Sequence, residues 1–393
     1  MKDFNQKGKV VVTCKDRFAP YLEQEIIQLG FQPEQVFRTR VELVASLNDC
    51  IFLNMHLRTA SHVLFEIKNF YLRHADDIYR RVKAIPWEEY FTKSTYFSVS
   101  SQVDHPSVDN PLFVNVRIKD AVVDRFRDNT GERPNSGSDY EGAVLQLYWK
   151  ETQATIYINT SGETIAKHGY RKIPGQAPML EALAAATVMA TGWNGKGVFL
   201  NPMCGSGTVA IEAALMATNR FPGLYRDHYS FMHFIGYEDS VYRAYKSELQ
   251  KKIRQGVTCR IIASDNSNQA VLISRENATN AGVEELIQFE TQDFRNIEVP
   301  ETDEGIIFFN PEYGERLGET DELVNTYREI GDFMKKRAAG YKGFIFTGNP
   351  DLAKKVGLKA KRRMEFYSGT IDCRLMQYDL YRGSRENRNE EAG

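Results

Sequence analysis

The stretch Val198–Ala214, VFLNPMCGSGTVAIEAA, constrains the fold more than any other part of this chain. It combines a short apolar strand at Val198–Leu200, a glycine-rich turn at Cys204–Gly207 and a helix with apolar residues at helical spacing. Such a strand, turn and helix point backbone N–H groups and the positive end of the helix dipole at one spot. The stretch therefore predicts a site for a small polar ligand. The turn glycines with Ala210 also fit the loose G-x-G-x-x-A dinucleotide pattern, so the ligand stays open at this point.

Length and composition limit the class of protein. The chain has 393 residues, which suggests two or three domains. No apolar run approaches the roughly 20 residues of a membrane-spanning helix, and the segment MKDFNQKGKVVV lacks the features of a secretion signal. We therefore expect a cytoplasmic protein with no membrane partner.

The cysteines and histidines indicate neither a disulfide framework nor a metal site. The 5 cysteines are scattered and form no C-x-x-C pair, and the 7 histidines form no H-x-x-x-H pattern. The formal net charge is −2, so a surface for nucleic acid has to be a local basic patch.

Strands and helices alternate after the organising stretch, which predicts a doubly wound parallel sheet with ligands at the carboxyl ends of its strands. The predicted strands are Cys259–Ala263, Ile287–Phe289, Gly305–Phe309 and Gly343–Thr347, and the predicted helices are Met179–Gly192, Ala270–Ala281 and Leu323–Arg337.

The part before Gly162 mixes strands and helices without an obvious catalytic constellation, as expected of an α+β accessory or binding region. The predicted strands are Lys9–Cys14, Val41–Ala45 and Tyr96–Gln102, with a hairpin formed by Gly142–Lys150 and Ala154–Asn159. Val63–Phe70 is a further apolar stretch. The predicted helices are Ala19–Leu29, Asp49–Arg58, Asp76–Ile85 and Phe113–Arg127.

Two strand ends carry acidic residues suited to an adenosine. Asp265 follows a strand and is placed to accept hydrogen bonds from a ribose diol. Asp293 follows the next strand and could accept from an adenine amine, with Phe294 covering the ring. Together with the glycine turn, they favour a nucleoside ligand over simple polar caps.

A further strand runs directly into Asn310-Pro311-Glu312-Tyr313. An amide oxygen and the carbonyl of a rigid proline form two adjacent acceptors, which can hold both hydrogens of a planar exocyclic amine while the aromatic ring stacks on the base. Holding the amine in this way directs its lone pair at an electrophile, which is catalysis by positioning and electrostatics.

These residues resemble the class I S-adenosylmethionine-dependent methyltransferases, and within them the THUMP-domain enzymes that make N2-methylguanosine in RNA. NPMCGSGT is similar to the family's cofactor loop, and NPEYGERL to its NPPYGERL motif. SGETIAKHGYR, APMLEALAA and GTIDCRL are similar to the segments that flank these motifs, and RHADDIYRRVKAIPWEEYF to the THUMP region. The closest resemblance is to the enzymes that modify guanine N2 in 23S rRNA, which are often labelled N6-adenine-specific DNA methylases.

The resemblance implies an α/β chain in which a Rossmann-like class I methyltransferase domain follows ferredoxin-like and THUMP domains. The expected boundaries are 1–62 for the ferredoxin-like domain, 63–163 for the THUMP domain, 164–383 for the methyltransferase domain and 384–393 for a polar tail.

The resemblance also implies the site residues and the cofactor, S-adenosyl-L-methionine. The expected cofactor-binding residues are Asn201, Pro202, Cys204, Gly205, Ser206, Gly207, Thr208, Asp265, Asn266, Asp293 and Phe294. The expected catalytic residues are Asn310, Pro311, Glu312 and Tyr313.

Two positions depart from the family pattern. Asn201 stands where Asp is common, which keeps an acceptor for the cofactor's ammonium group but removes a charge. Glu312 replaces the second proline of NPPY, and its role as proton acceptor, guanine contact or neutral position stays open.

RNA, either rRNA or a ribosomal precursor, is the expected partner, and local cations are the expected contacts because basic patches position the phosphate backbone. The candidates are Arg80, Arg81, Lys83, Lys167, Arg171, Lys172 and Arg316, with a further basic stretch at Lys354–Arg363. The sequence leaves the oligomeric state and the modified nucleotide open.

Other functions compete with guanine-N2 methylation of 23S rRNA. The acceptor pair would also serve adenine N6 in DNA or RNA, or a guanine in tRNA. A nicotinamide-dependent dehydrogenase would use the glycine turn, but it expects an acidic residue about 20 positions beyond the glycines, and Asp265 lies much farther along. An RNA-binding assembly factor without activity is the remaining alternative.

Overall fold

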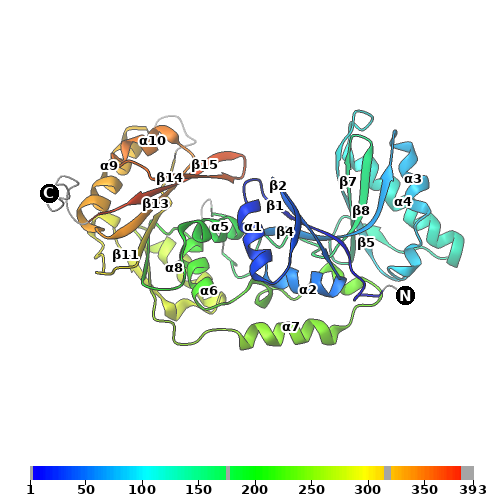
Figure 1. Ribbon diagram of the computed structural model, residues 1–393, viewed down its shortest axis with the longest axis horizontal. Coiled ribbons are helices and arrows are strands. Elements are labelled where there is room, and N and C mark those ends of the chain that lie inside the picture. Colours follow the sequence, from blue (N-terminus) through cyan, green and yellow to red (C-terminus); the bar gives the residue numbers. More distant parts are fainter. Residues whose placement is uncertain (1–2, 174–177, 314–319, 382–393) are drawn as a thin grey trace. The chain divides into compact units, whose positions relative to one another are not determined.

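In a computed structural model, the chain is described over residues 3–173, 178–313 and 320–381. These residues cluster into two compact units, each with its own extended sheet (Figure 1). Unit 1 takes the described residues of Met1–Lys15, Leu22–Ala166 and Pro222–Lys251, and unit 2 takes those of Asp16–Tyr21, Lys167–Phe221 and Lys252–Gly393.

Unit 1 contains an 8-stranded sheet in the order β2-β3-β1-β4-β8-β7-β5-β6. Its strands are β1 (Gly8–Cys14), β2 (Pro33–Phe37), β3 (Arg40–Ala45), β4 (Ala60–Tyr71), β5 (Phe97–Asp104), β6 (Ser136–Gly137), β7 (Ala143–Lys150) and β8 (Gln153–Asn159). Its helices are most of α1 (Ala19–Gln28), with α2 (Leu47–His56), α3 (Asp76–Lys83), α4 (Pro111–Thr130) and α7 (Asp239–Lys251).

A single strand, β4, holds this sheet together. It pairs antiparallel with β1 on one side and with β8 on the other. The ferredoxin-like and THUMP parts therefore share one sheet, and the boundary expected near residue 62 falls within β4. The predicted hairpin is confirmed, because β7 and β8 pair antiparallel around a turn in which Glu151 has φ +51°.

The sequence analysis missed α7 and the short strand β2. The Pro222–Lys251 segment belongs to unit 1, although it lies inside the 164–383 range expected for the methyltransferase domain. Packing explains this: the ring of Tyr245 on α7 lies edge-on to Phe52 on α2, with 5.4 Å between centroids. At Gly223, an added Cβ would come within 2.6 Å of Met55, so the chain runs directly over α2.

Unit 2 contains a 7-stranded sheet in the order β11-β10-β9-β12-β13-β15-β14. Its strands are β9 (Val198–Pro202), β10 (Arg260–Asp265), β11 (Ile287–Thr291), β12 (Gly305–Phe309), β13 (Tyr341–Thr347), β14 (Arg362–Ser368) and β15 (Ile371–Asp379). Its helices are α5 (Glu181–Thr191), α6 (Thr208–Ala217), α8 (Asn268–Asn280), α9 (Thr320–Arg337) and α10 (Pro350–Lys355).

The sheet of unit 2 is doubly wound, as predicted. The neighbouring strands β11, β10, β9, β12 and β13 pair in parallel. Strands β15 and β14 complete the sheet with antiparallel pairing. Successive side chains of a strand point to opposite faces. Val198, Leu200 and Ile307 pack with residues of α9 and α10 in one core cluster, whereas Phe199 lies edge-on to Trp193 at 5.2 Å.

The core of unit 2 makes a prediction for stability. Ile262 on β10 is 1% exposed and belongs to the cluster with α9. We expect Ile262→Ala to lower the free energy of unfolding by about 2–5 kcal/mol, because it removes buried methyl groups and leaves a cavity. Denaturant and thermal midpoints measure this loss.

The matched control is Leu272→Ala on α8, where the side chain is 58% exposed. It should change stability by no more than about 0.5 kcal/mol. Equal midpoints for the two variants would contradict the assignment of this core.

Candidate active site

The loop between β9 and α6 is built on unusual backbone angles. Met203, Gly205 and Gly207 have φ values of +57°, +54° and +78°, and the loop closes through a 2.8 Å hydrogen bond from the Gly207 N–H to the Cys204 carbonyl. An added Cβ at Gly207 would lie 1.9 Å from Oγ of Ser274, whereas one at Gly205 would meet none of the described residues within 4 Å. Gly207 is therefore required for packing against α8, and Gly205 leaves open space above the loop.

Asp265 at the tip of β10 fastens this loop. Its Oδ2 accepts a hydrogen bond from the Gly205 N–H at 3.0 Å, and its Oδ1 accepts from the Ser267 N–H at 3.0 Å. Each carboxylate oxygen has a second lone pair, so the group can still accept from a diol. Asn266 is exposed beside it.

Asn201 is the most informative polar residue of the site. Its side chain is 1% exposed, and its Nδ2 donates to the Phe308 carbonyl on β12 at 2.9 Å. Its Oδ1 is buried without a hydrogen-bond partner in the described part of the chain. A buried acceptor without a donor is costly, so this oxygen fits a ligand that brings an N–H group, such as an ammonium.

The side chains of Asp293 and Phe294 make more contacts within the protein than the sequence suggested. Both oxygens of Asp293 accept from the guanidinium of Arg295, which lowers the pKa of the Asp293 carboxyl. The ring of Phe294 is only 6% exposed and packs edge-on against Phe309 and Phe333. These contacts give the Phe294 ring a core role, and its role over an adenine remains a prediction.

The Asn310–Tyr313 loop follows β12 and is supported by the end of β13. Asn349 Nδ2 donates to the Tyr313 carbonyl at 3.4 Å. Burial raises the pKa of the Cys373 thiol on β15, and the Tyr313 side chain acts in the opposite direction. An added Cβ at Gly348 would lie 3.1 Å from the Tyr313 ring, so the ring rests against bare backbone.

Exposure in this loop varies from residue to residue. Pro311 is buried, Glu312 is exposed, and Asn310 and Tyr313 are half-buried. The described residues provide no hydrogen-bond partner for the side chain of Asn310, so its amide is available to a ligand.

The sheet order brings the two loops together. β9 lies between β10 and β12, and Ile307 on β12 is in register with Leu200 on β9. The chain moves outward to β10 and β11 on one side of β9 and to β12 and β13 on the other, which makes the end of β9 a topological switch point. Asn201, Asp265 and Asn310 thus share one edge of the sheet, where doubly wound folds bind their ligands.

The structure divides the predicted RNA contacts on α3. Arg81 is exposed, and Arg80 is exposed while paired with Asp77 at 3.2 Å. Lys83 is 34% exposed and pairs with Asp128 at 2.7 Å, so its charge is partly neutralised.

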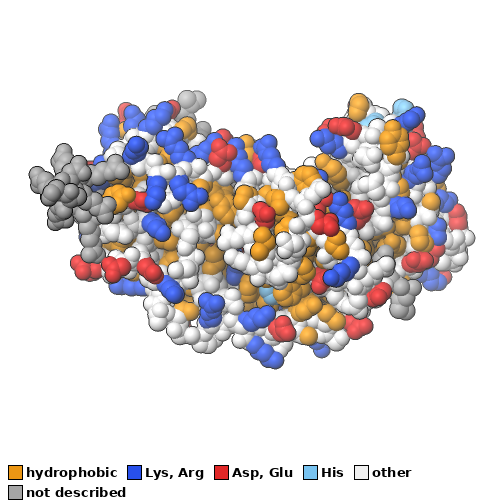
Figure 2. Space-filling model, in the orientation of Figure 1, with side chains coloured by type: hydrophobic (Ala, Val, Ile, Leu, Met, Phe, Trp, Pro, Cys, Tyr) orange, Lys and Arg blue, Asp and Glu red, His pale blue; other side chains and the backbone are white. Residues whose placement is uncertain are grey.

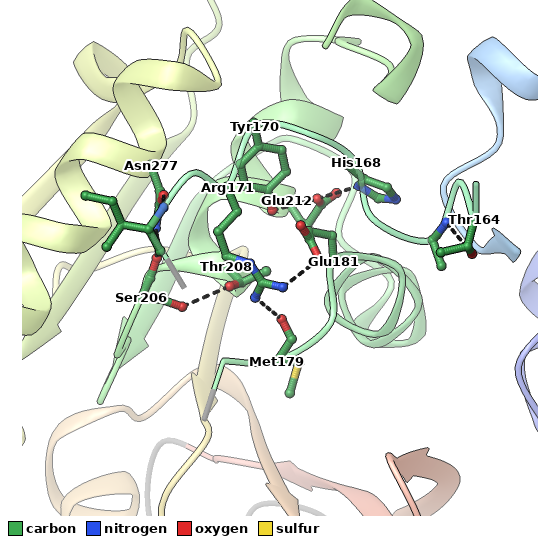
Figure 3. Close-up of polar contacts among 12 residues, drawn as sticks. Thr164, His168, Tyr170, Arg171, Met179, Glu181, Ser206, Thr208, Glu212 and Asn277 are labelled. Carbon is green, nitrogen blue, oxygen red and sulfur yellow. Dashed lines mark hydrogen bonds and ion pairs between the residues drawn. The ribbon is translucent and has the colours of Figure 1, made fainter. Parts of the chain in front are cut away.

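The predictions for the 167–172 stretch need one correction. Lys167 and Lys172 are exposed, as a phosphate contact requires. Arg171 is 11% exposed, donates to Glu181 at 2.9 Å and to the Met179 carbonyl at 2.6 Å, and is committed to contacts within unit 2 (Figure 3). We therefore withdraw Arg171 as an RNA contact. Arg316 lies outside the described residues.

Sequence reasoning missed three polar residues that hydrogen-bond to segments around the site: Glu212, Asn277 and Asn349. Glu212 had a detectable signal, because it is the one charged residue in the apolar helix TVAIEAALMA. Asn277 and Asn349 had none, because an Asn in a helix or turn is ordinary in a sequence.

Two structural absences can be stated for the described residues. No three His, Cys, Asp or Glu side chains come together there as a metal site would need. Among the same residues, none of the helices is long and apolar enough to cross a membrane.

The doubly wound sheet, the glycine loop after its first strand and the Asn-Pro-x-Tyr loop after its fourth define a class I methyltransferase fold. Comparison with known families agrees: residues 168–377 match the family described as an RMKL-like methyltransferase domain, residues 73–159 match the THUMP domain, and residues 9–64 match the RlmL ferredoxin-like domain. The chain belongs to the RMKL-like methyltransferase family.

The relatives include a protein from Syntrophotalea carbinolica named ribosomal RNA large subunit methyltransferase K/L. It is 34% identical over 382 residues, which cover 95% of this chain and 53% of the relative. The chain spans about half the length of the curated relatives that it matches.

Solved structures with the same fold cover nearly the whole chain. The protein SMU.472, described as a putative methyltransferase and crystallised with SAH, is 25% identical with a TM-score of 0.87, and the match covers 98% of this chain and 100% of that one. A Listeria monocytogenes protein described as a predicted N6-adenine-specific DNA methylase is 27% identical with a TM-score of 0.86, and the match covers 95% of this chain and 97% of that one.

The hydrogen bond from Asn201 predicts a pH-dependent effect of its acid variant. In Asn201→Asp, the ionised carboxylate cannot donate to the Phe308 carbonyl, and we expect a loss of about 1–3 kcal/mol in the free energy of unfolding. Burial should raise the folded-state pKa of the new carboxyl above its unfolded value, because the neutral form can donate. The stability that the protonated carboxyl contributes is then present at acidic pH and is lost as the pH rises through the folded pKa.

Thermal unfolding across a pH series measures this effect. The control is Asn194→Asp, at an exposed residue whose Oδ1 accepts from the Lys196 N–H at 3.0 Å and would still do so as a carboxylate. The same deficit at every pH would rule out the donor role of Asn201.

Proposed function

We propose that this protein is an S-adenosylmethionine-dependent RNA methyltransferase that modifies the exocyclic N2 of a guanosine in large-subunit (23S) rRNA. The observation that carries the proposal is the placement of the Asn310–Tyr313 loop beside the glycine loop, at the switch point of the sheet. Membership of the RMKL-like methyltransferase family and the rRNA methyltransferase named among the relatives support it.

The cofactor is S-adenosylmethionine, which supplies a methyl group carried on a sulfonium. The glycine loop and the start of α6 receive its methionine part, with the unpartnered Oδ1 of Asn201 as acceptor for the ammonium group. Asp265 accepts from the ribose while it fastens the loop. We assign Asp293, which follows β11 and caps the short turn Phe294–Asn296, to the adenine.

The target base lies against the Asn310–Tyr313 loop. The Asn310 amide oxygen and the Pro311 carbonyl accept the two hydrogens of the amine, and Tyr313 packs on the base. An exocyclic amine is a weak nucleophile because its lone pair is delocalised into the ring. Two acceptors favour the pyramidal amine and aim its lone pair at the methyl group, so the site acts by positioning and electrostatics.

A structural relative supports a second candidate, methylation of adenine N6, because the Listeria monocytogenes protein carries that description. Two acceptors in a loop would hold either amine. The rRNA methyltransferase in Syntrophotalea carbinolica is the more similar in sequence, at 34% against 27% identity, which favours an rRNA substrate. The resemblance of NPEYGERL to the motif of the guanine-N2 enzymes makes guanine N2 our choice.

The RNA contacts that we propose are exposed cations. In unit 1 they are Arg80 and Arg81 on α3, within the THUMP match. In unit 2 they are Lys167 and Lys172, together with the exposed Lys and Arg side chains of the Lys354–Arg363 stretch. Figure 2 shows blue side chains gathered where Figure 1 draws α10 and β14. A cytoplasmic location follows from an rRNA substrate.

The Asn310→Ala variant tests the chemistry. We expect it to bind SAH like the parent and to lose about 100-fold or more in methyl transfer, because one of the two acceptors is gone. Transfer of a labelled methyl group to rRNA measures the rate, and calorimetry measures SAH binding.

The control for this variant is Asn325→Ala, at an exposed residue on α9. If Asn310→Ala methylates as fast as the parent, the proposed chemistry is wrong and an RNA-binding assembly factor without activity becomes the better explanation.

The exposed side chains of Lys167 and Lys172 lead to a prediction about how RNA binding depends on salt concentration. In a Lys167→Ala, Lys172→Ala double variant, each lost phosphate contact should reduce the slope of log K against log salt by about 0.7–0.9. Titrations of labelled rRNA fragments at several salt concentrations measure the slope. The Arg171→Ala variant should instead lose thermal stability, because Glu181 would be left buried without its partner. An unchanged slope in the double variant would remove these lysines from the RNA surface.

A further inference from the structure

The 167–173 segment is fastened to α6 by a buried carboxylate. Glu212 on α6 is 0% exposed, and its Oε1 accepts from the Tyr170 hydroxyl at 2.8 Å and lies 2.7 Å from His168 Nδ1 (Figure 3). His168 and Tyr170 are each 1% exposed. Both rings therefore turn inward from a segment whose lysines face solvent.

The same segment is fastened to the start of α5. Arg171 donates to Glu181, the first residue of that helix, and to the Met179 carbonyl (Figure 3). Burial raises the pKa of Glu181, and the charge of Arg171 acts in the opposite direction. Loss of either partner would leave the other charge buried without compensation, so the pair holds the segment against the start of α5.

Asn277 on α8 connects this segment to the glycine loop. Its side chain is fully buried, and its Nδ2 donates to the Ile173 carbonyl at 2.9 Å and to the Ser206 carbonyl at 3.3 Å. Its Oδ1 accepts from the Ile173 N–H at 3.3 Å. One amide thus joins the end of the 167–173 segment to the middle of the loop.

The bond to Ser206 matters because of the peptide it holds. The Ser206 carbonyl and the Gly207 N–H belong to the same planar peptide unit. The carbonyl accepts from Asn277, and the N–H donates to the Cys204 carbonyl at 2.8 Å. Rotation of this peptide plane would break one or both of these hydrogen bonds. The two bonds therefore hold the shape of the Cys204–Gly207 turn.

We propose that Asn277 is a positioning residue for the cofactor, which aligns the glycine loop with the 167–173 segment that Glu212 and Glu181 fasten in place. The inference rests on the proposed function as far as the ligand is concerned. Asn277 reaches the ligand only through Ser206, so its removal disturbs cofactor affinity and leaves the acceptors for the base unchanged.

The Asn277→Asp variant tests the positioning role of Asn277, because the Asp side chain has nearly the same shape as Asn. A carboxylate keeps the acceptor for the Ile173 N–H but faces the Ile173 and Ser206 carbonyls with no donor. We expect the Kd for SAH and the KM for S-adenosylmethionine to rise roughly tenfold, about 1.4 kcal/mol. At saturating cofactor, kcat and the KM for RNA should stay within about twofold, because a loss of binding that is equal in ground and transition states leaves kcat unchanged.

The control is Asn280→Ala at the exposed end of α8, which should match the parent in every measurement. A lower thermal midpoint with an unchanged Kd for SAH would assign Asn277 a structural role only and overturn the proposal. A fall in kcat at saturating cofactor with an unchanged KM for S-adenosylmethionine would also overturn it.

If Asn277→Asp does not fold, Tyr170→Phe decides the question. This variant keeps the ring but removes the hydroxyl that donates to Glu212. Weaker SAH binding supports the proposal, and parental binding overturns it. SAH binding is measured without RNA, so a protein that binds SAH but methylates no guanosine would refute the proposed function alone.

Discussion

The hydrogen bond from Asn201 to the Phe308 carbonyl joins the two halves of the site. It connects the end of β9, which leads into the glycine loop, to the end of β12, which leads into Asn310. A neutral amide suits this position because its nitrogen donates to β12, while its buried oxygen has no hydrogen-bond partner among the described residues. The departure from the more common Asp at this position therefore has a physical reason. Asn201 lacks the charge of an Asp, but its amide N–H donates the hydrogen bond that joins the ends of β9 and β12.

The sequence predicted the scaffold of unit 2 well because its signals are local. Apolar runs such as Gly305–Phe309 are strands that are buried on both faces, and their ends carry the residues that the site needs. The positive φ values at Gly205 and Gly207 follow from the same local logic. The order and register of the strands bring the predicted residues to one edge of the sheet. The sequence indicated only that strands and helices alternate, and it did not give the strand order.

The remaining features depend on contacts between distant residues. Arg171 reads as a surface cation in KHGYRK, but Glu181 lies within its reach and the ion pair is nearly buried. The packing of Phe294 against Phe309 and Phe333 was likewise not predicted, and its role over an adenine stays a prediction. The Pro222–Lys251 segment lies between two strands of unit 2 in the sequence and packs in unit 1. These contacts join residues that are far apart in the sequence, so no local periodicity or motif could have predicted them.

The central claim is that the two acceptors of the Asn310–Tyr313 loop present guanine N2 to the methyl group. The most direct measurement is nucleoside analysis of 23S rRNA from cells with and without this protein, followed by mapping of N2-methylguanosine. The account predicts that one N2-methylguanosine disappears with the protein and returns when purified protein and S-adenosylmethionine are added to the RNA. Loss of N6-methyladenosine, with every N2-methylguanosine intact, would contradict it.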